Sequence, residues 1–392
     1  MPSASSAPTL PFLERLLDGE KVEWKTLGEV CDRTKGTKIT ATQMKAMHKS
    51  NAPVKIFAGG QTFALVDYND LPQSDIYFFP SIIVKSRGII EFEYYDKPFS
   101  HKSEMWSYHT NSPDVNAKFL YYYLKTREDY FQQLGSVMQM PQISIPTTEK
   151  FPIPIPPLRV QSRIVEILDK FTQLEAELEA ELEARNKQYD FYRNRLLDFA
   201  LRDDLKGQVE WKTLGEVCEN LDSQRRPITS SKRIKGIYPY YGASGIVDFV
   251  ESYIYDGDYL LVSEDGANLL ARNTPIAFSI SGKNWVNNHA HVLKFDTYEG
   301  RKFVEYYLNH IDLKPYISGA AQPKLNQNNL NSIPIPLPPL SEQRRIVDIL
   351  DRFDTLTNSI SEGLPREIAL RRKQYEYYRD ALLRFPPPAP TA

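Results

Sequence analysis

The chain carries one sequence pattern twice, and this internal repeat constrains the fold more than any other feature. Residues 22–31 read VEWKTLGEVC, and residues 209–218 read the same ten letters 187 positions later. Later segments recur in the same order: PIPIPPL at 152–158 and PIPLPPL at 334–340, then RIVEILDKF at 163–171 and RIVDILDRF at 345–353. Because the offset stays between 182 and 187, the chain is one module of about 185 residues present twice.

Each module has two parts with different residue patterns, which predict a globule followed by a long helix. The first part places β-branched and aromatic runs, such as 82–84 and 259–262, between glycines and prolines, so we expect a mixed α/β globule. One helix is expected in each globule, at about 116–134 and 301–308. The second part shows apolar spacing near 3.6 from about 160 to 201, which predicts one helix about 60 Å long.

The second long helix, at about 341–385, contains Gly363-Leu364-Pro365, which predicts a break or kink. Helices of this length must bury their apolar stripe, and the nearest partner for each is the other copy. We therefore expect antiparallel pairing, with one globule at each end. The predicted class is α+β: two tandem α/β domains joined by two long antiparallel coiled-coil helices, pseudo-twofold symmetric. The expected boundaries are 1–157, 158–206, 207–339 and 340–385, with a disordered tail at 386–392.

Composition and charge restrict the function. With 392 residues, 41% hydrophobic and 25% charged, the chain has the profile of a folded soluble protein. It has no apolar run of about 18 residues, so we expect neither a membrane span nor a secretory signal, and a cytoplasmic location. The net charge of −2 argues against a nonspecific nucleic-acid coat, so any DNA contact must be local.

The long helices carry two further patterns. Residues 174–184 read LEAELEAELEA, a coiled-coil seam whose glutamates would repel phosphates, so this stretch is predicted to be a spacer. Aromatic and arginine residues near the helix ends are candidates for docking a partner protein. Packing of the two helices against each other explains them equally well. These residues are Tyr189, Tyr192, Arg193, Tyr375, Tyr378 and Arg379.

The loops of both globules contain amides, hydroxyls and cations, which are the groups that read base edges and phosphates. Turns are also rich in such residues for conformational reasons alone, so each loop taken singly has a structural alternative. The DNA-binding candidates in the first globule are Gly60, Gln61, Thr62, Lys85, Ser86, Arg87, Lys102, Ser103, Gln139 and Gln142. Those in the second are Tyr241, Gly242, Ser244, Gly245, Asn268, Asn287, Asn288, His289, Gln322, Lys324 and Asn326.

Catalytic motifs are absent from the sequence. There is no Asn-Pro-Pro-aromatic segment, no phosphate-binding Gly-x-x-x-x-Gly-Lys-Ser/Thr loop and no metal-spaced Cys/His cluster. His289 and His291 alternate as on a strand and lack a third ligand, which favours a structural or DNA-facing role. The neighbours Glu264 and Asp265 would point to opposite faces of a strand. We therefore expect no catalytic residue, no metal ligand and no cofactor bound by this chain.

The repeated segments VEWKTLGEVC, PIPIPPL/PIPLPPL and RIVEILDKF/RIVDILDRF, with KQYDFYRNRLLDF at 187–199 and KQYEYYRDALLRF at 373–385, resemble the specificity subunits of type I restriction-modification systems. The resemblance covers nearly the whole chain. It implies that the two globules are target-recognition domains and that the helices are conserved spacers. It further implies a non-catalytic prokaryotic subunit that reads a bipartite double-stranded DNA target, one half-site per domain, in host defence.

The resemblance also implies the partners. Two adenine-N6 methyltransferase subunits would use S-adenosylmethionine, and two restriction/translocase subunits would use ATP and Mg²⁺. A pseudo-twofold scaffold presents each docking surface twice, which independently predicts two copies of a partner. The alternative from a different class is a stand-alone two-headed scaffold that binds protein or other ligands.

Overall fold

The computed structural model describes residues 11–135, 141–319 and 322–386. The chain divides into two compact units: Met1–Leu178 with Ile368–Ala392, and Glu179–Glu367. Each unit contains one globule together with parts of the long helices. Gln139, a DNA-binding candidate, and residues 387–392 of the expected tail lie outside the described residues.

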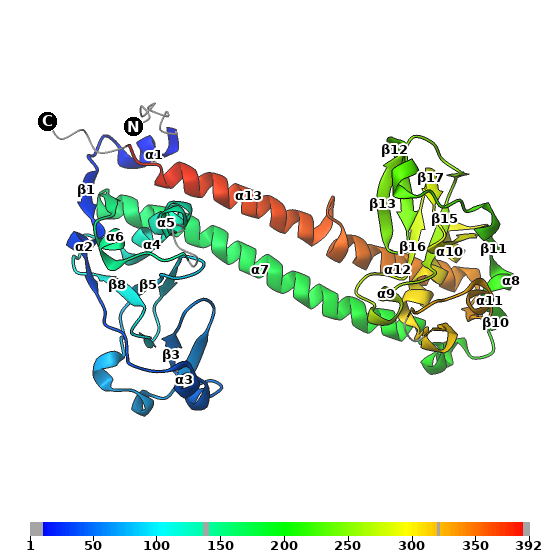
Figure 1. Ribbon diagram of the computed structural model, residues 1–392, viewed down its shortest axis with the longest axis horizontal. Helices are drawn as coiled ribbons and strands as arrows, with labels where there is room; N and C mark the ends of the chain where they lie inside the picture. Colours follow the sequence, from blue (N-terminus) through cyan, green and yellow to red (C-terminus); the bar gives the residue numbers. More distant parts are fainter. Residues whose placement is uncertain (1–10, 136–140, 320–321, 387–392) are drawn as a thin grey trace. The chain divides into compact units, whose positions relative to one another are not determined.

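The first globule is built around two sheets and a two-stranded ribbon (Figure 1). The larger sheet has the order β2 (Cys31–Arg33), β8 (Trp106–Thr110), β5 (Ser81–Lys85) and β6 (Glu91–Tyr95). The smaller sheet has the order β4 (Phe63–Val66), β3 (Val54–Phe57) and β7 (Phe99–His101), and β3 runs parallel to β7. The ribbon pairs β1 (Glu23–Thr26) with β9 (Pro152–Ile155). The helices are α1 (Pro11–Leu17), α2 (Leu27–Val30), α3 (Ala41–Met47), α4 (Ala117–Lys125), α5 (Glu128–Gly135) and α6 (Ile145–Glu149).

The second globule repeats this topology. Its first sheet has the order β11 (Glu219–Asn220), β18 (Ala290–Lys294), β15 (Tyr259–Ser263) and β16 (Ala277–Ile280). Its second has the order β13 (Gly245–Val250), β12 (Lys235–Gly242), β17 (Lys283–Val286) and β14 (Tyr255–Asp256), and β12 runs parallel to β17. The ribbon pairs β10 (Glu210–Thr213) with β19 (Pro334–Leu337). The helices are α8 (Leu214–Val217), α9 (Asn268–Ala271), α10 (Tyr298–His310) and α11 (Gln327–Asn331).

The long helices are α7 (Leu158–Leu197), α12 (Leu340–Asn358) and α13 (Gly363–Leu383). The helix predicted at 160–201 is therefore confirmed, although it ends at Leu197 and a short 3₁₀ turn, Phe199–Leu201, follows. The predicted break is also confirmed, because residues 359–362 separate α12 from α13 and Gly363 has φ +74°. No helix of the described residues is long and apolar enough to cross a membrane.

One predicted helix is wrong. Residues 116–134 form two helices, α4 and α5, instead of one. The Thr126 hydroxyl donates to the carbonyl of Tyr123 at 2.7 Å, so a side chain competes for backbone acceptors where α4 ends. The other predicted helix, 301–308, lies inside the longer α10.

Each globule attaches to the start of a long helix through the same buried positions. In the first unit, Ile82 of β5, Phe119 of α4 and Ile164 of α7 belong to one core. Figure 1 shows α4, α5 and α6 beside the amino-terminal part of α7. In the second unit the corresponding core contains Leu260, Phe303 and Ile346.

Within each unit the helices of the two copies pack antiparallel, as predicted. In the first unit, Phe171 stacks on Tyr378 at 5.4 Å and Glu175 accepts a hydrogen bond from Arg372 at 2.5 Å. Residue numbers therefore rise along α7 as they fall along α13.

In the second unit, Tyr192 stacks on Phe353 at 5.7 Å, and Arg202 beyond α7 donates to Glu342 at 2.7 Å. The direction of pairing is the same.

Candidate nucleic-acid interface

In the first globule, separate chain segments meet at one place, which we call the loop end: residues 58–62, 85–88, 102–104 and 141–143. The amide of Lys102 donates to Phe57, the last residue of β3, at 2.9 Å. The amide of Gly88 donates to Pro141 at 2.9 Å. These bonds join segments that lie 45 and 53 positions apart in the sequence.

The second globule has an equivalent loop end: residues 242–245, 263–266, 287–289 and 322–326. The amide of Asn287 donates to Tyr241 at 3.0 Å, as Lys102 does to Phe57. The amide of Gly266 donates to Pro323 at 3.2 Å, as Gly88 does to Pro141. The two loop ends therefore share one backbone frame.

Not every candidate of the first loop end presents its side chain to solvent. Lys85 and Ser86 are buried, and the Lys85 ammonium pairs with Glu91 at 3.1 Å and Glu93 at 3.0 Å. Burial alone would lower the pKa of Lys85, but the two carboxylates outweigh it and raise the pKa. Lys102 is half-buried and pairs with a neighbouring carboxylate, Glu104, at 2.6 Å. The exposed candidates are Gly60, Gln61, Thr62, Arg87, Ser103 and Gln142.

Three amide candidates of the second globule have structural hydrogen bonds. Both amide atoms of Asn268 bond to the backbone of Thr274, at 3.0 and 3.1 Å. Asn287 is buried and accepts from the amide of His289, and Asn326 caps α11 by accepting from the amide of Asn329 at 2.9 Å.

The remaining candidates of this loop end differ in exposure. Gly242 is buried, Tyr241 and Gly245 are half-buried, and Gly245 has φ +122°, which favours glycine. The exposed candidates are Ser244, Asn288, His289, Gln322 and Lys324.

A buried charged network lies beneath the second loop end. Nδ1 of the fully buried His291 lies 2.6 Å from Asp222, and its Nε2 lies 2.7 Å from the carbonyl oxygen of Leu325. Arg225 bridges Asp222 at 3.3 Å and Glu264 at 2.5 Å. Sequence reasoning missed Asp222 and Arg225 because they precede the strand of His291 by more than 60 positions.

The electrostatics of this network favour ionised carboxylates. Burial alone would raise the pKa of Asp222, but the hydrogen bond and charge of His291 and the charge of Arg225 outweigh it, so the pKa is lowered. The pKa of Glu264 is likewise lowered against the effect of burial, chiefly by the hydrogen bond from Arg225 and the charge of His291. Glu264 faces inward, whereas the side chain of Asp265 is 34% exposed and pairs with His289. The two neighbours point to opposite sides, as predicted.

A basic segment that sequence reasoning passed over also reaches the first loop end. The amide of Thr37 donates to His101 at 2.8 Å, and Lys35 and Lys38 on either side are exposed. A Cβ at Gly36 would lie 2.3 Å from the carbonyl oxygen of Lys102, so only glycine allows this approach. The available signal was a glycine between lysines, KGTK, shortly after the first repeat.

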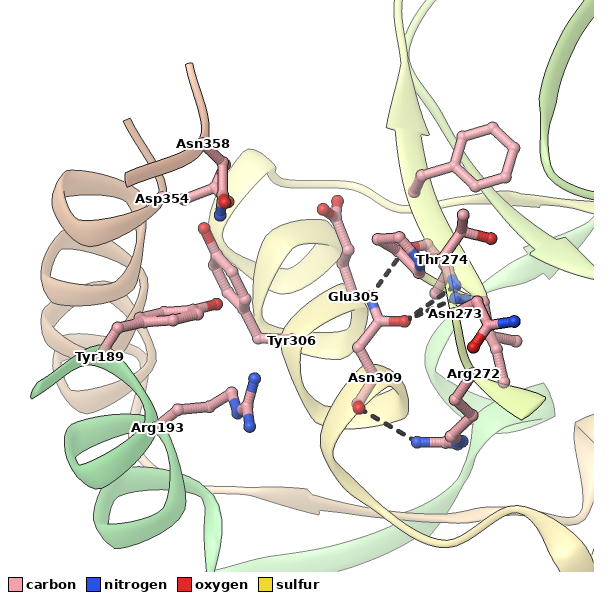
Figure 2. A pocket seen from close by; sticks show the side chains of 14 residues that line it. Tyr189, Arg193, Arg272, Asn273, Thr274, Glu305, Tyr306, Asn309, Asp354 and Asn358 are labelled. Atoms are coloured by element: carbon pink, nitrogen blue, oxygen red, sulfur yellow. Dashed lines mark hydrogen bonds between the residues drawn. The ribbon is translucent and has the colours of Figure 1, made fainter. Parts of the chain in front are cut away.

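The docking candidates line a pocket in each unit. Figure 2 shows the pocket of the second unit, about 390 Å³, with Tyr189 and Arg193 of α7 facing Tyr306 of α10. The pocket of the first unit, about 610 Å³, is lined by Tyr375 and by Tyr122, the residue of α4 that corresponds to Tyr306.

The other docking candidates take part in helix packing. Tyr192 and Tyr378 stack on phenylalanines of the opposing helix, as described above. The Arg379 guanidinium lies over the ring of Tyr375, four residues earlier on the same helix, at 5.8 Å. Tyr189 and Tyr375, which line the pockets, also contact phenylalanines of the opposing helix, Phe353 at 6.0 Å and Phe171 at 6.4 Å. Packing of the two helices therefore accounts for these aromatic residues, and a docking role stays a prediction.

Two globules with one backbone frame and different loop side chains, each joined to paired helices, define a protein built from two related but non-identical domains. The described residues contain no group of three or more His, Cys, Asp or Glu side chains able to hold a metal ion. Residues 19–184 and 207–370 each match the family described as "Type I restriction modification DNA specificity domain". The chain belongs to the specificity subunits of type I restriction-modification systems, which are non-catalytic members of their complexes.

Individual relatives agree with this assignment. The specificity subunit of the Escherichia coli type I restriction enzyme EcoR124I/EcoR124II is 34% identical over 97% of this chain and 98% of that protein. The specificity subunit of EcoprrI, also from Escherichia coli, is 30% identical over 90% of this chain and 92% of its own. A crystal structure of a type I S subunit from M. genitalium has the same fold, with a TM-score of 0.65 at 19% identity, covering 94% of this chain and 98% of that one.

Proposed function

We propose that this subunit supplies the DNA sequence specificity of its complex, with each globule binding one half-site of a bipartite double-stranded DNA target. The observation that carries the proposal is the pair of loop ends: equivalent backbone hydrogen bonds at both, with different exposed side chains. A conserved frame with variable loops is what a protein needs to read two different sequences. Arg87, Lys35 and Lys38 supply local positive charge at the first loop end, in a chain with a net charge of −2.

The paired pockets support docking of two methyltransferase subunits. Each pocket is lined by a tyrosine of a long helix and a tyrosine of the globule's own helix, so one partner surface fits both. We propose that these partners are adenine-N6 methyltransferases that use S-adenosylmethionine. Two restriction/translocase subunits, which use ATP and Mg²⁺, would join through them in the cytoplasm.

Co-expression with the methyltransferase subunit of the same system tests this function. Native mass spectrometry should find two methyltransferase subunits per chain, and mapping of N6-methyladenine in host DNA should give one bipartite motif. The chain alone, supplied with S-adenosylmethionine, should methylate nothing. A complex that methylates without sequence preference would contradict the proposal.

A single-pocket variant tests the docking sites separately. Arg193→Glu reverses a charge that lines the second unit's pocket only, so we expect the complex to retain one methyltransferase subunit instead of two. Arg195→Glu is the matched control, because Arg195 is exposed on the same helix and does not line the pocket. Equal stoichiometry in both variants would remove this pocket from the docking surface.

A further inference from the structure

The two loop ends carry opposite chemistry at one equivalent position. The residue between Ser86 and Gly88 is Arg87, and the residue between Glu264 and Gly266 is Asp265. The equivalence follows from the backbone. Ile143 donates to Ser86 at 3.0 Å as Leu325 donates to Glu264 at 2.8 Å.

Each of these residues also has an equivalent cross-strand neighbour. Arg87 forms an antiparallel bridge with Gln142, and Asp265 forms one with Lys324. Residues opposite each other in such a bridge place their side chains on the same face. One face of each loop end therefore carries arginine and glutamine in the first globule, and aspartate and lysine in the second.

In the first globule this face presents hydrogen-bond donors. Arg87 is exposed, and within the described part of the chain no hydrogen bond or ion pair of its guanidinium is found. Burial would raise the pKa of Glu104, but Lys102 and the nearby charge of Arg87 outweigh it and lower the pKa, so Arg87 lies close to the loop that precedes β8. A guanidinium with free donors matches the O6 and N7 acceptors of guanine in the major groove.

In the second globule the Lys324 ammonium pairs with Glu264 at 3.1 Å, and the acceptors on this face come from Asp265 and His289. Nδ1 of His289 lies 2.8 Å from the Asp265 carboxylate, so Nδ1–H donates and Nε2 is the ring atom left for DNA. His289 has an exposed side chain and occupies the position of Glu104, one residue before the strand that pairs with β15. The carboxylate keeps further lone pairs, and such acceptors match the exocyclic amino groups of cytosine and adenine.

This inference rests on the proposed function: we propose that this position selects one base in each half-site. The protein donates hydrogen bonds to that base in the first half-site and accepts them from it in the second. Arg87 reads a guanine in the first half-site. Asp265 and His289 accept from a base amino group, of cytosine or adenine, in the second. The amide of Glu264 donates to the carbonyl of His289 at 2.9 Å, which joins the two segments that carry the acceptors.

The test is methylation mapping of the complex on a library in which both half-sites are randomised. Arg87→Gln should reduce the preference for guanine at one position of the first half-site by about 5- to 100-fold. Asp265→Asn should relax the preference for an amino-bearing base at one position of the second half-site, and the base lost identifies cytosine or adenine. In each case the other half-site is the internal control and shows that the variant is folded.

Arg87→Lys separates base reading from phosphate contact. A lysine keeps the charge and can still donate to guanine but lacks the fork, so it should retain only part of the guanine preference that the glutamine variant loses. An unchanged motif in Arg87→Gln would overturn the proposal. Lys97→Gln and Asp296→Asn are matched controls. Both residues are exposed, and each lies near the end of its strand, β7 or β18, that is farther from the loop end. If the unaltered complex gives no bipartite motif, the proposed function itself fails.

Discussion

At the residue scale, the two globules fill one position of the frame with different chemistry. The amide of Leu221 donates to Val292 at 2.8 Å, as that of Thr34 donates to Ser107 at 2.9 Å. After Leu221 comes the buried carboxylate Asp222 of the charged network. In the first globule the residue after Thr34 is the exposed Lys35, and Thr34 Oγ1 lies 2.6 Å from Ser107 Oγ and 2.7 Å from Nε2 of the buried His101. Only the second globule therefore depends on buried ionised groups at this place.

This difference predicts a pH dependence that Asp222→Asn removes. The pKa of Asp222 is lowered from its ordinary 3.8 and that of Glu264 from 4.5. A lowered carboxyl pKa stabilises the fold above the unfolded-state pKa, and this stabilisation is lost as the pH falls through the folded-state pKa. The thermal midpoint of the wild type should therefore exceed that of Asp222→Asn at pH 6, and the gap should narrow as the pH falls below about 3.8. A difference in thermal midpoint that does not change with pH would contradict this role. The control variant Asp296→Asn should have the same thermal midpoint as the wild type.

A second prediction at this scale concerns Asn326, a DNA-binding candidate whose side chain caps α11. Asn326→Ala should lower the free energy of unfolding by about 0.5–2 kcal/mol, because the amide of Asn329 loses its acceptor. The control is Ser144→Ala at the start of α6, since Ser144 makes no side-chain bond to the helix backbone. Denaturant unfolding measures both. If both variants lose the same free energy of unfolding, the cap does not contribute to stability. A role in DNA reading would then be the remaining explanation for Asn326.

Residue roles were harder to predict from the sequence than residue types. The candidates of each loop end were found because turn residues with amides and cations stand out between strands. Which of these side chains are buried could not be predicted. The burial of Lys85, for example, depends on the register of β5 against β6, which places Glu91 and Glu93 beside it. The network of Asp222 and His291 depends on pairing between distant strands, and no local pattern encodes it.

At the element scale, the long helices differ in continuity. α7 runs without interruption from Leu158 to Leu197, through the four-residue repeat of leucine, alanine and glutamate. Its counterpart is interrupted at 359–362, and α13 begins at Gly363. The sequence predicted both because helical spacing and a Gly-Leu-Pro segment are local signals.

Replacing Gly363 by alanine should lower the free energy of unfolding for two separate reasons. Its φ is +74°, and a Cβ there would lie 2.3 Å from the carbonyl oxygen of Thr355. The control is Gly282, whose φ is +75° with nothing within 4 Å of the added Cβ. Gly282→Ala should cost about 1–2 kcal/mol for the left-handed backbone alone, and Gly363→Ala should cost more. Equal losses in denaturant unfolding would show that the close approach is relieved without cost.

At the scale of the whole molecule, the duplicated frame is the central feature. The order of the first sheet, the parallel pairing inside the second sheet and the core positions that meet the long helices recur in both units, although the second sheet has three strands in the first globule and four in the second. The repeated segments predicted the duplication, and they form the β1–β9 and β10–β19 ribbons and parts of the long helices. The loop ends diverge, so sequence comparison of the two copies located them but could not assign their contacts.

Exchanging one globule tests whether each globule reads its own half-site. Residues 209–339 would be replaced by the corresponding residues of a relative with a known target, and N6-methyladenine would be mapped in cells that also express the methyltransferase subunit. Because each globule has its own frame and loop end, we expect one half-site to change to that of the relative while the other stays the same. A motif in which both half-sites change together, or neither does, would contradict it.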